Sequence, residues 1–157
     1  MTQSGNTDWT SVTGGAAAHT GAYRSEFGPV GSSGFLSQSF SAPGGAALTI
    51  SFWLQNDDGT PNGFSVALNG GTLFSLSDAA ASAYQQYTFS ASGSVSGTNT
   101  LEFSFQNDPA WWRLDDVSAQ VAGLPVPEPT SMALLGTGLL GLGLAGRRRR
   151  QGDATSA

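Results

Sequence analysis

Short runs in which apolar and polar residues alternate, separated by turn-forming residues, dominate the chain between residues 35 and 121. The clearest run, ALTISFWLQN at 47–56, puts four large apolar residues on one face of a strand. Apolar runs on both sides of Asn69-Gly70-Gly71 are typical of a β-hairpin. Because no helical periodicity interrupts this pattern before Pro127, we predict an all-β fold: an antiparallel β-sandwich, jelly-roll-like, of about seven strands.

The first part of the chain shows this pattern poorly. Residues 1–34 are rich in Gly, Ser, Thr and Ala and contain only scattered large apolar side chains. We predict an irregular segment here, the remainder of a truncated first-strand region, with Trp9, Tyr23 and Phe27 packed on the sheet edge and the sandwich confined to 35–121. The opening MTQSGNTDWTSVTGG lacks the basic and apolar regions of a secretory signal peptide, so we expect the natural chain to begin further upstream.

The charge of the chain excludes several classes of partner. Charged residues make up only 11%, well below the roughly 25% of an average soluble domain. Before Pro127, two arginines (Arg24 and Arg113) stand against nine acidic residues, a formal net charge of 2 − 9 = −7. Nucleic acids and anionic membrane surfaces both require clustered Lys or Arg, so neither is expected as a partner of this part. The absence of cysteine excludes disulfides, thiolate metal sites and cysteine nucleophiles.

The C-terminal part has a different organisation. Residues 122–130 hold three prolines between 125 and 129, which predicts an extended Pro-rich linker. Residues 131–146 carry no charge and as a helix would span about 24 Å, slightly less than a hydrocarbon core of roughly 30 Å. We predict a single transmembrane helix here and a basic cytoplasmic tail at 147–157, because arginines remain on the cytoplasmic side. The stop-transfer cluster consists of Arg147, Arg148, Arg149 and Arg150.

This order of features resembles the PEP-CTERM sorting signal of Gram-negative bacteria. The resemblance covers 126–150: Pro127, Glu128 and Pro129, then a Gly- and Leu-rich span, then the arginine cluster. It implies recognition at Pro127-Glu128-Pro129 by a membrane-embedded exosortase, which cuts near this motif. It also implies an exported protein, anchored in the inner membrane by the C-terminal helix before it reaches the cell surface or the exterior, often among exopolysaccharides. The chain departs from the family in the residues QGDATSA that follow the arginines.

An enzymatic function finds little support. The one histidine, His19, lies in a stretch of Gly, Ala and Thr, where we expect a solvated side chain. GxSxG, HExxH and P-loop motifs are absent from the sequence, and the pair Asp57-Asp58 before Gly59 is typical of a turn. We therefore predict that the chain is not an enzyme.

A second acidic pair lies within the last predicted strand. In WWRLDDVSAQ, Leu114 and Val117 fall on opposite faces of a regular strand and face inward together only if a bulge lies near Asp115 or Asp116. A bulge would redirect one carboxylate, either toward a calcium ion held by oxygen ligands or simply into water. Both alternatives stay open from the residues alone.

The sandwich segment also resembles the galactose-binding-like jelly roll of many carbohydrate-binding modules. An aromatic residue followed by Leu114-Asp115-Asp116-Val117-Ser118 near the last strand carries this resemblance, over about residues 34–121. It implies that Asp115 helps to bind a structural calcium, although the Asn-Gly-Phe-Glu type segment that supplies its partners in the family is missing here. No other cofactor is expected.

Sugar binding requires exposed aromatic faces with amide or carboxylate groups beside them. Trp53 points away from the apolar face of its strand and Gln55 follows on the same side, so both are candidate ligand-binding residues, together with Trp111. Three functions follow in order of preference. The first is a surface or matrix protein whose sandwich contacts a glycan or exopolysaccharide. The second is a structural or adhesive matrix protein without a ligand site, and the third is a secreted glycan-active enzyme.

Overall fold

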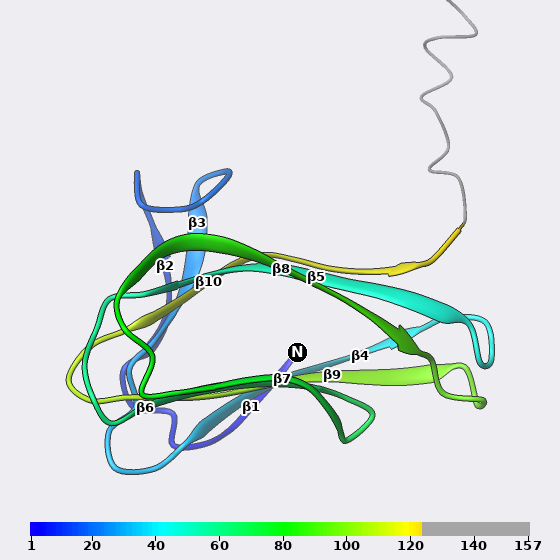
Figure 1. Cartoon of the computed structure of the whole chain (residues 1–157), viewed down its shortest axis with the longest axis horizontal. Coiled ribbons are helices and arrows are strands. Elements are labelled where there is room, and N and C mark those ends of the chain that lie inside the picture. The colour runs from blue at the N-terminus through cyan, green and yellow to red at the C-terminus, as the bar shows by residue number, and fades with distance from the viewer. Residues whose placement is uncertain (124–157) are drawn as a thin grey trace, which may run out of the picture. The chain divides into compact units, whose positions relative to one another are not determined.

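A computed structural model describes residues 1–123 as ten strands in two five-stranded antiparallel sheets, which confirms the predicted all-β sandwich. Residues 1–122 form one compact unit, and the sheets lie as two layers (Figure 1). Sheet one has the order β1 (Thr2–Gly5), β4 (Gly34–Ser41), β9 (Thr98–Asn107), β6 (Asn62–Leu68) and β7 (Gly71–Ser77). Sheet two has the order β2 (Thr10–Gly14), β3 (Tyr23–Phe27), β10 (Trp112–Val121), β5 (Ala47–Asn56) and β8 (Ser82–Ser92).

The core lies between the two sheets and follows the alternation seen in the sequence. On β5 the inward residues Leu48, Ile50, Phe52 and Leu54 are all buried. The residues between them point outward and are partly exposed. Phe52 makes ring contacts with residues of both sheets, among them Phe103 at 5.6 Å. Burial of large apolar side chains from both sheets is the main stabilising contribution to this sandwich.

The predicted hairpin is present as β6 and β7. Leu68 pairs with Gly71, so the loop consists of Asn69 and Gly70 alone. Both have positive φ, 53° and 79°, which is the conformation that a two-residue turn requires and that Asn and Gly tolerate. The turn chemistry of the sequence therefore predicts this hairpin correctly, although the pairing of the two strands shifts register between Val66 and Ala67.

The expectation of an irregular segment over residues 1–34 is wrong for three stretches of it. Strands β1, β2 and β3 lie there, and β3 pairs with β10 in the middle of sheet two. The edge position predicted for Phe27 is also wrong, because this side chain is 1% exposed and belongs to the core. These strands have only four or five residues, mostly polar, so the alternation that reveals longer strands is too short to be recognised.

Buried amides tie the loops together at one end of the sandwich. Asn107 donates to Asn56 Oδ1 at 2.9 Å, and Asn56 donates to the carbonyl of Ala79 at 2.8 Å. Asn62 donates to the same carbonyl at 2.9 Å. Because buried amides are costly unless they are hydrogen-bonded, this network favours one arrangement of the loops.

The C-terminal predictions fall beyond this unit. The transmembrane helix at 131–146, the tail at 147–157 and nearly all of the linker at 122–130 lie outside the described residues. Within residues 1–123, no helix has the length and apolar character needed to cross a membrane.

Candidate functional site

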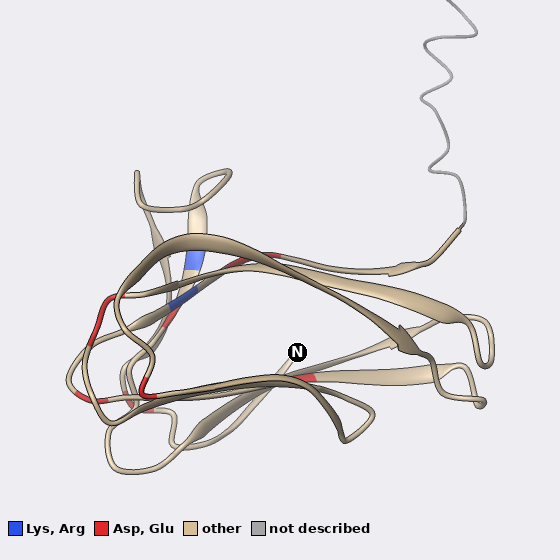
Figure 2. Ribbon diagram, in the orientation of Figure 1, with Lys and Arg blue, Asp and Glu red and all other residues tan. Residues whose placement is uncertain are grey.

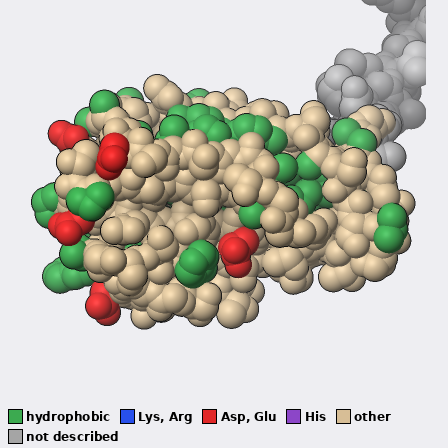
Figure 3. All heavy atoms as spheres, turned by 60° about the horizontal axis from the view of Figure 1, so that its bottom comes forward, with side chains coloured by type: hydrophobic (Ala, Val, Ile, Leu, Met, Phe, Trp, Pro, Cys, Tyr) green, Lys and Arg blue, Asp and Glu red, His purple; other side chains and the backbone are tan. Residues whose placement is uncertain are grey.

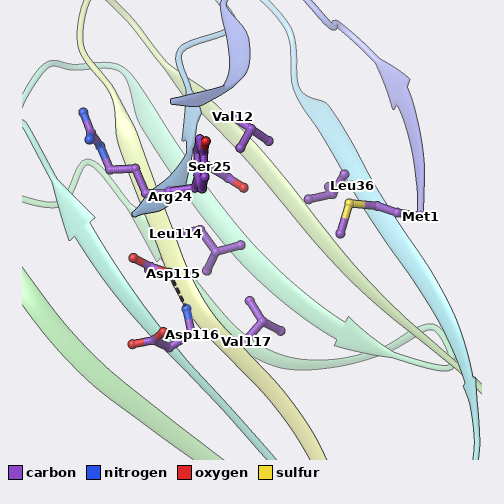
Figure 4. Close-up of a pocket in the computed structure, with 10 residues that line it drawn as sticks. Met1, Val12, Arg24, Ser25, Leu36, Leu114, Asp115, Asp116 and Val117 are labelled. Atoms are coloured by element: carbon purple, nitrogen blue, oxygen red, sulfur yellow. Dashed lines mark hydrogen bonds between the residues drawn. The ribbon is translucent and has the colours of Figure 1, made fainter. Parts of the chain in front are cut away.

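The outer face of sheet two carries most of the residues that the sequence singled out, and a bulge in β10 shapes it. The register of β10 against β5 shifts between Asp115 and Ser118, and Asp116 has a positive φ of 48°. Figure 4 shows the consequence: Leu114 and Val117 point to one side of the strand, and both aspartates point to the other. The predicted bulge is therefore confirmed.

An ion-pair cluster occupies the same face toward one end of β10. Glu26 Oε1 accepts hydrogen bonds from Arg24 Nη2 at 2.6 Å and from Arg113 Nε at 3.0 Å. Arg113 also pairs with Asp57, whose Oδ1 accepts a hydrogen bond from Gln55 at 3.0 Å. Burial alone would raise the pKa of Glu26, but the hydrogen bonds from Arg113, Arg24 and Thr13 outweigh it and lower that pKa.

The His19 side chain packs on the sheet instead of extending into solvent. The expectation of a solvated side chain, which rested on its stretch of Gly, Ala and Thr, is therefore wrong. The His19 imidazole lies on the indole of Trp53, with ring centroids 3.7 Å apart and planes 18° from parallel. Its Nδ1 lies 2.7 Å from Asp116 Oδ2, and its backbone N–H donates to Asp115 Oδ2 at 2.8 Å. Thr20 donates to the other oxygen of Asp116. The hydrogen bonds from Thr20 and His19 lower the pKa of Asp116.

The contacts of Asp115 do not fit a calcium site. One of its oxygens accepts the His19 N–H and the other accepts the N–H of Asp116 at 2.8 Å. The neighbouring Asp116 carboxylate is engaged by His19 and Thr20. Within residues 1–123, no group of three or more His, Asp or Glu side chains is placed to hold a metal ion. Calcium prefers six to eight oxygen ligands, and these carboxylates are already satisfied by N–H and O–H donors.

A depression lined almost entirely by apolar groups lies at one end of the sandwich. It has a volume of about 270 Å³ and is lined by Trp9, Gly28, Val30, Pro109, Ala110 and Trp111. The two tryptophans meet edge to face, with centroids 6.2 Å apart and planes at 80°. Backbone hydrogen bonds hold both tryptophans to the residues that follow β3 and β5: the Gly28 N–H donates to the Trp9 carbonyl and the Asp57 N–H donates to the Trp111 carbonyl, both at 3.0 Å.

Gly28 is needed for this arrangement. A Cβ at this position would lie 3.0 Å from Trp111 Cε3 and 3.0 Å from the Ala110 carbonyl oxygen. The missing side chain therefore lets the Trp111 ring lie against the backbone of residue 28. Trp9 is 67% exposed, so its ring presents a free apolar surface to solvent.

Charge is distributed unevenly over the described unit. Figure 2 shows that most charged residues lie toward one end of the sandwich and that the two arginines lie on β3 and β10. The side turned forward in Figure 3 shows mostly uncharged polar surface, with scattered hydrophobic and acidic side chains and no visible Lys or Arg. Both aromatic candidate sites are built from residues of sheet-two strands or of the loops next to them.

The structure brings some of the predicted residues together and separates others. Trp53 pairs with Asp115 across β5 and β10, and Gln55 pairs with Arg113 on the same face. Trp111 precedes β10 and lines the end depression instead. Sequence reasoning missed Trp9 as a partner of Trp111. The available signal was a tryptophan in a polar segment with no alternating apolar neighbours, which indicates an exposed ring.

Comparisons with known proteins support the resemblance of the C-terminal part to a sorting signal and that of the sandwich to carbohydrate-binding modules. Residues 125–150 match the PEP-CTERM protein-sorting motif, whereas no curated protein matches the chain. Among solved structures, TmCBM61 in complex with β-1,4-galactotriose superposes with a TM-score of 0.64 at 17% identity, covering 76% of this chain and 87% of that one.

Two further solved structures share the fold. A family 35 carbohydrate-binding module from an environmental isolate has a TM-score of 0.53 at 19% identity, covering 82% of this chain and 92% of that one. The CBM22-1–GH10 modules of endo-1,4-β-D-xylanase 10B from Clostridium thermocellum, complexed with xylohexaose, have a TM-score of 0.56 at 14% identity, covering 81% and 27%. The chain thus carries a PEP-CTERM protein-sorting motif at residues 125–150, behind a β-sandwich with the jelly-roll fold of carbohydrate-binding modules.

Proposed function

We propose that this chain is an exported bacterial surface protein whose sandwich binds a glycan in the depression between Trp9 and Trp111. The observation that carries the binding proposal is this pair of tryptophans, one of them 67% exposed, set edge to face around an apolar hollow. The apolar faces of sugar rings stack on such indoles, and two rings at a steep angle hold a sugar from two sides. The volume of about 270 Å³ lies just below the range of typical ligand pockets, which suits a short segment of a glycan chain.

Polar groups that could bind sugar hydroxyls stand next to the depression in the sequence. Asp8 directly precedes Trp9, and Asp108 directly precedes Pro109. A few polar groups around an apolar wall supply orientation and specificity in ligand sites. The matching folds support this proposal, since carbohydrate-binding modules predominate among the similar structures. They favour binding over catalysis as the role of the sandwich.

Charge argues against other ligands for the sandwich. Arg24 and Arg113 are both committed to ion pairs with Glu26 and Asp57. No further Lys or Arg occurs in residues 1–123, so the surface offers little that would attract a polyanion. A neutral polysaccharide fits this surface better than a nucleic acid or an anionic lipid.

The C-terminal part supplies the route to the surface in this proposal. The helix at 131–146 holds the chain in the inner membrane, with Arg147 to Arg150 in the cytoplasm. An exosortase recognises Pro127-Glu128-Pro129 and cuts nearby, which delivers the sandwich to the cell surface. The presence of the PEP-CTERM motif at 125–150 supports this sequence of events.

The binding proposal can be tested with two soluble oligosaccharides, β-1,4-galactotriose and xylohexaose, titrated calorimetrically against the full chain in detergent. We expect Trp111→Ala and Trp9→Ala to weaken binding about tenfold, because each removes a stacking surface that contributes about 1.4 kcal/mol. Tyr23→Ala is the matched control, since Tyr23 is an equally exposed aromatic residue, 68%, outside the depression. Equal binding by all three variants would overturn this site, and no binding of any glycan would favour a structural matrix protein.

A further inference from the structure

The loop between β2 and β3, residues 15–22, lies against the outer face of sheet two and covers Trp53; we refer to it as the cover loop. In Figure 1 it stands on the outer side of this sheet. The loop reaches across β10 so that the His19 ring stacks on Trp53 of β5 and meets Tyr84 of β8 edge-on, at 5.5 Å. An indole that would otherwise face solvent on an open sheet is thus shielded by a residue of the same chain.

The contacts of the cover loop reproduce those that a sugar ring makes in a binding site. A flat ring lies on the Trp53 indole, an N–H group donates to Asp115, and the Thr20 hydroxyl donates to Asp116. A pyranose offers the same combination, with an apolar ring face for stacking and hydroxyls that donate to carboxylates. Trp53, Asp115 and Asp116 therefore form a surface with the chemistry of a sugar site, and His19 with Thr20 occupies it.

The cover loop is attached to this surface at few points. Within the described residues, its hydrogen bonds to the sheet all come from His19 and Thr20. Its two backbone hydrogen bonds, Gly15 N–H to the Ala22 carbonyl and Ala18 N–H to the Gly15 carbonyl, stay within the loop. Gly15 and Gly21 flank these residues with positive φ and with free space around them. A loop held by so few contacts opens at low cost.

The closed arrangement also leaves a polar group unsatisfied. The Tyr84 hydroxyl is buried and has no hydrogen-bond partner within residues 1–123. Burial, and then the negative charge of Asp115, raise the pKa of Tyr84, so this hydroxyl stays protonated and available as a donor. An unpaired buried hydroxyl at this surface carries a free-energy cost, which a hydrogen bond to a ligand oxygen would remove.

We propose that Trp53, Asp115 and Asp116 form a second sugar-binding site, which the cover loop closes by placing His19 where a sugar ring would stack. Glycan binds there by displacing residues 19 and 20, and the free protein holds the site shut. The ligand class rests on the proposed glycan binding, but the site is separate from the Trp9–Trp111 depression.

The cover is tested first without any ligand, by oxidising the tryptophans of the full chain with N-bromosuccinimide and locating the products by mass spectrometry. In the natural chain we expect the exposed Trp9 to react and the buried Trp112 to be protected. Trp53 should be protected as well, because the His19 ring lies on its indole. In His19→Ala, Trp53 should become reactive while Trp112 stays protected, which shows that the fold is intact. Equal reactivity of Trp53 in both proteins would overturn the proposal.

A second variant keeps this test decisive if His19→Ala perturbs the fold. Thr20→Val removes one hydrogen bond to Asp116 and leaves the His19 ring in the chain. We expect Trp53 to react at an intermediate rate in this variant, because the loop opens more often. Protection of Trp53 as complete as in the natural chain would contradict the assigned role of residues 19 and 20.

Binding of β-1,4-galactotriose and xylohexaose then identifies the site. His19→Ala should raise the affinity for at least one of them about tenfold, because the binding-competent state no longer has to displace the loop. Adding Trp53→Ala should abolish this gain, whereas adding Trp111→Ala should leave it. Two results would overturn the second site but not the Trp9–Trp111 depression as a binding site. One is that adding Trp111→Ala abolishes the affinity gain of His19→Ala. The other is that the natural chain binds an oligosaccharide and His19→Ala does not bind it more tightly. Absence of binding by every variant overturns both.

Discussion

Phe27 of β3 and Phe105 of β9 stack across the two sheets with ring centroids 3.9 Å apart and planes 18° from parallel. The two residues belong to different sheets and are among the largest fully buried side chains of the described unit. Through this contact, β3 contributes a buried ring to the core, and the N-terminal strands of sheet two are packed against the rest of the sandwich. It explains why a segment with little apolar content is part of the sandwich.

Replacing Phe27 by Ala should therefore destabilise the sandwich by about 3 to 5 kcal/mol, since it removes a buried ring and leaves a cavity. The control is Tyr23→Ala on the same strand, where the side chain is 68% exposed and the change should stay within about 0.5 kcal/mol. Urea unfolding followed by tryptophan fluorescence measures both. Similar losses in the two variants would show that β3 is not anchored through Phe27.

The ion-pair cluster predicts a specific response to acid. The pKa of Glu26 is lowered from its ordinary value of 4.5, so its carboxylate contributes stability above that pH and loses the contribution as pH falls through the lowered value. Glu26→Gln should reduce the free energy of unfolding at pH 7 by about 1 to 3 kcal/mol, because two arginines lose their shared acceptor. Below pH 4.5, the free energy of unfolding of Glu26→Gln should decline less than that of the natural chain, because the variant has no carboxylate to protonate at this position.

The matched control for Glu26 is Glu102→Gln, which neutralises an exposed acid on β9. We expect this variant to change the free energy of unfolding at pH 7 by no more than about 0.5 kcal/mol in urea unfolding, because the side chain is exposed. If the acid response of Glu26→Gln equals that of Glu102→Gln, the cluster does not contribute to stability.

Gly28 lines the depression and lets the Trp111 ring lie against the backbone, so a side chain at this position should impair glycan binding. Alanine here brings a Cβ within 3.0 Å of Trp111 and should displace the ring, lowering glycan affinity several-fold while costing about 1 to 3 kcal/mol of stability through overpacking. Gly63→Ala on β6 is the control, because a Cβ there meets only one atom, at 3.9 Å. Titration with the same oligosaccharides measures the difference. Unchanged affinity in Gly28→Ala would separate the Trp111 position from binding.

The sorting proposal predicts opposite outcomes for two tail variants. Replacing Pro127, Glu128 and Pro129 by Ala should leave uncut full-length chain in the membrane fraction, because the recognition motif is lost. Replacing all four residues Arg147 to Arg150 by Gln should weaken retention at the membrane, because the stop-transfer charge is gone. Immunoblots of membrane, surface and medium fractions from an exosortase-containing host distinguish these results. Normal processing of the first variant would contradict recognition at this motif.

Short-range sequence patterns were sufficient to predict several features of the folded protein. The alternation on β5 predicts which residues enter the core, the pair Asn69-Gly70 predicts the hairpin, and the spacing of Leu114 and Val117 predicts the bulge. Each of these features depends on residues a few positions apart, whose geometry is set by the strand period and by turn conformation. The C-terminal motif is likewise a short contiguous pattern, and it matches at residues 125–150.

Contacts between distant segments were decided only by the tertiary structure. The His19 N–H donates a hydrogen bond to Asp115, 96 positions further along the chain. Phe27 stacks on Phe105, and Trp9 contacts Trp111 edge to face. Nothing within a few residues of His19 or Trp9 identifies these partners, because side chains from separate loops and strands meet only after both sheets have formed and packed. The amino-acid sequence thus determined the strands with clear alternation and the sorting motif, whereas the folded sandwich alone decided which aromatic rings are free and which are covered.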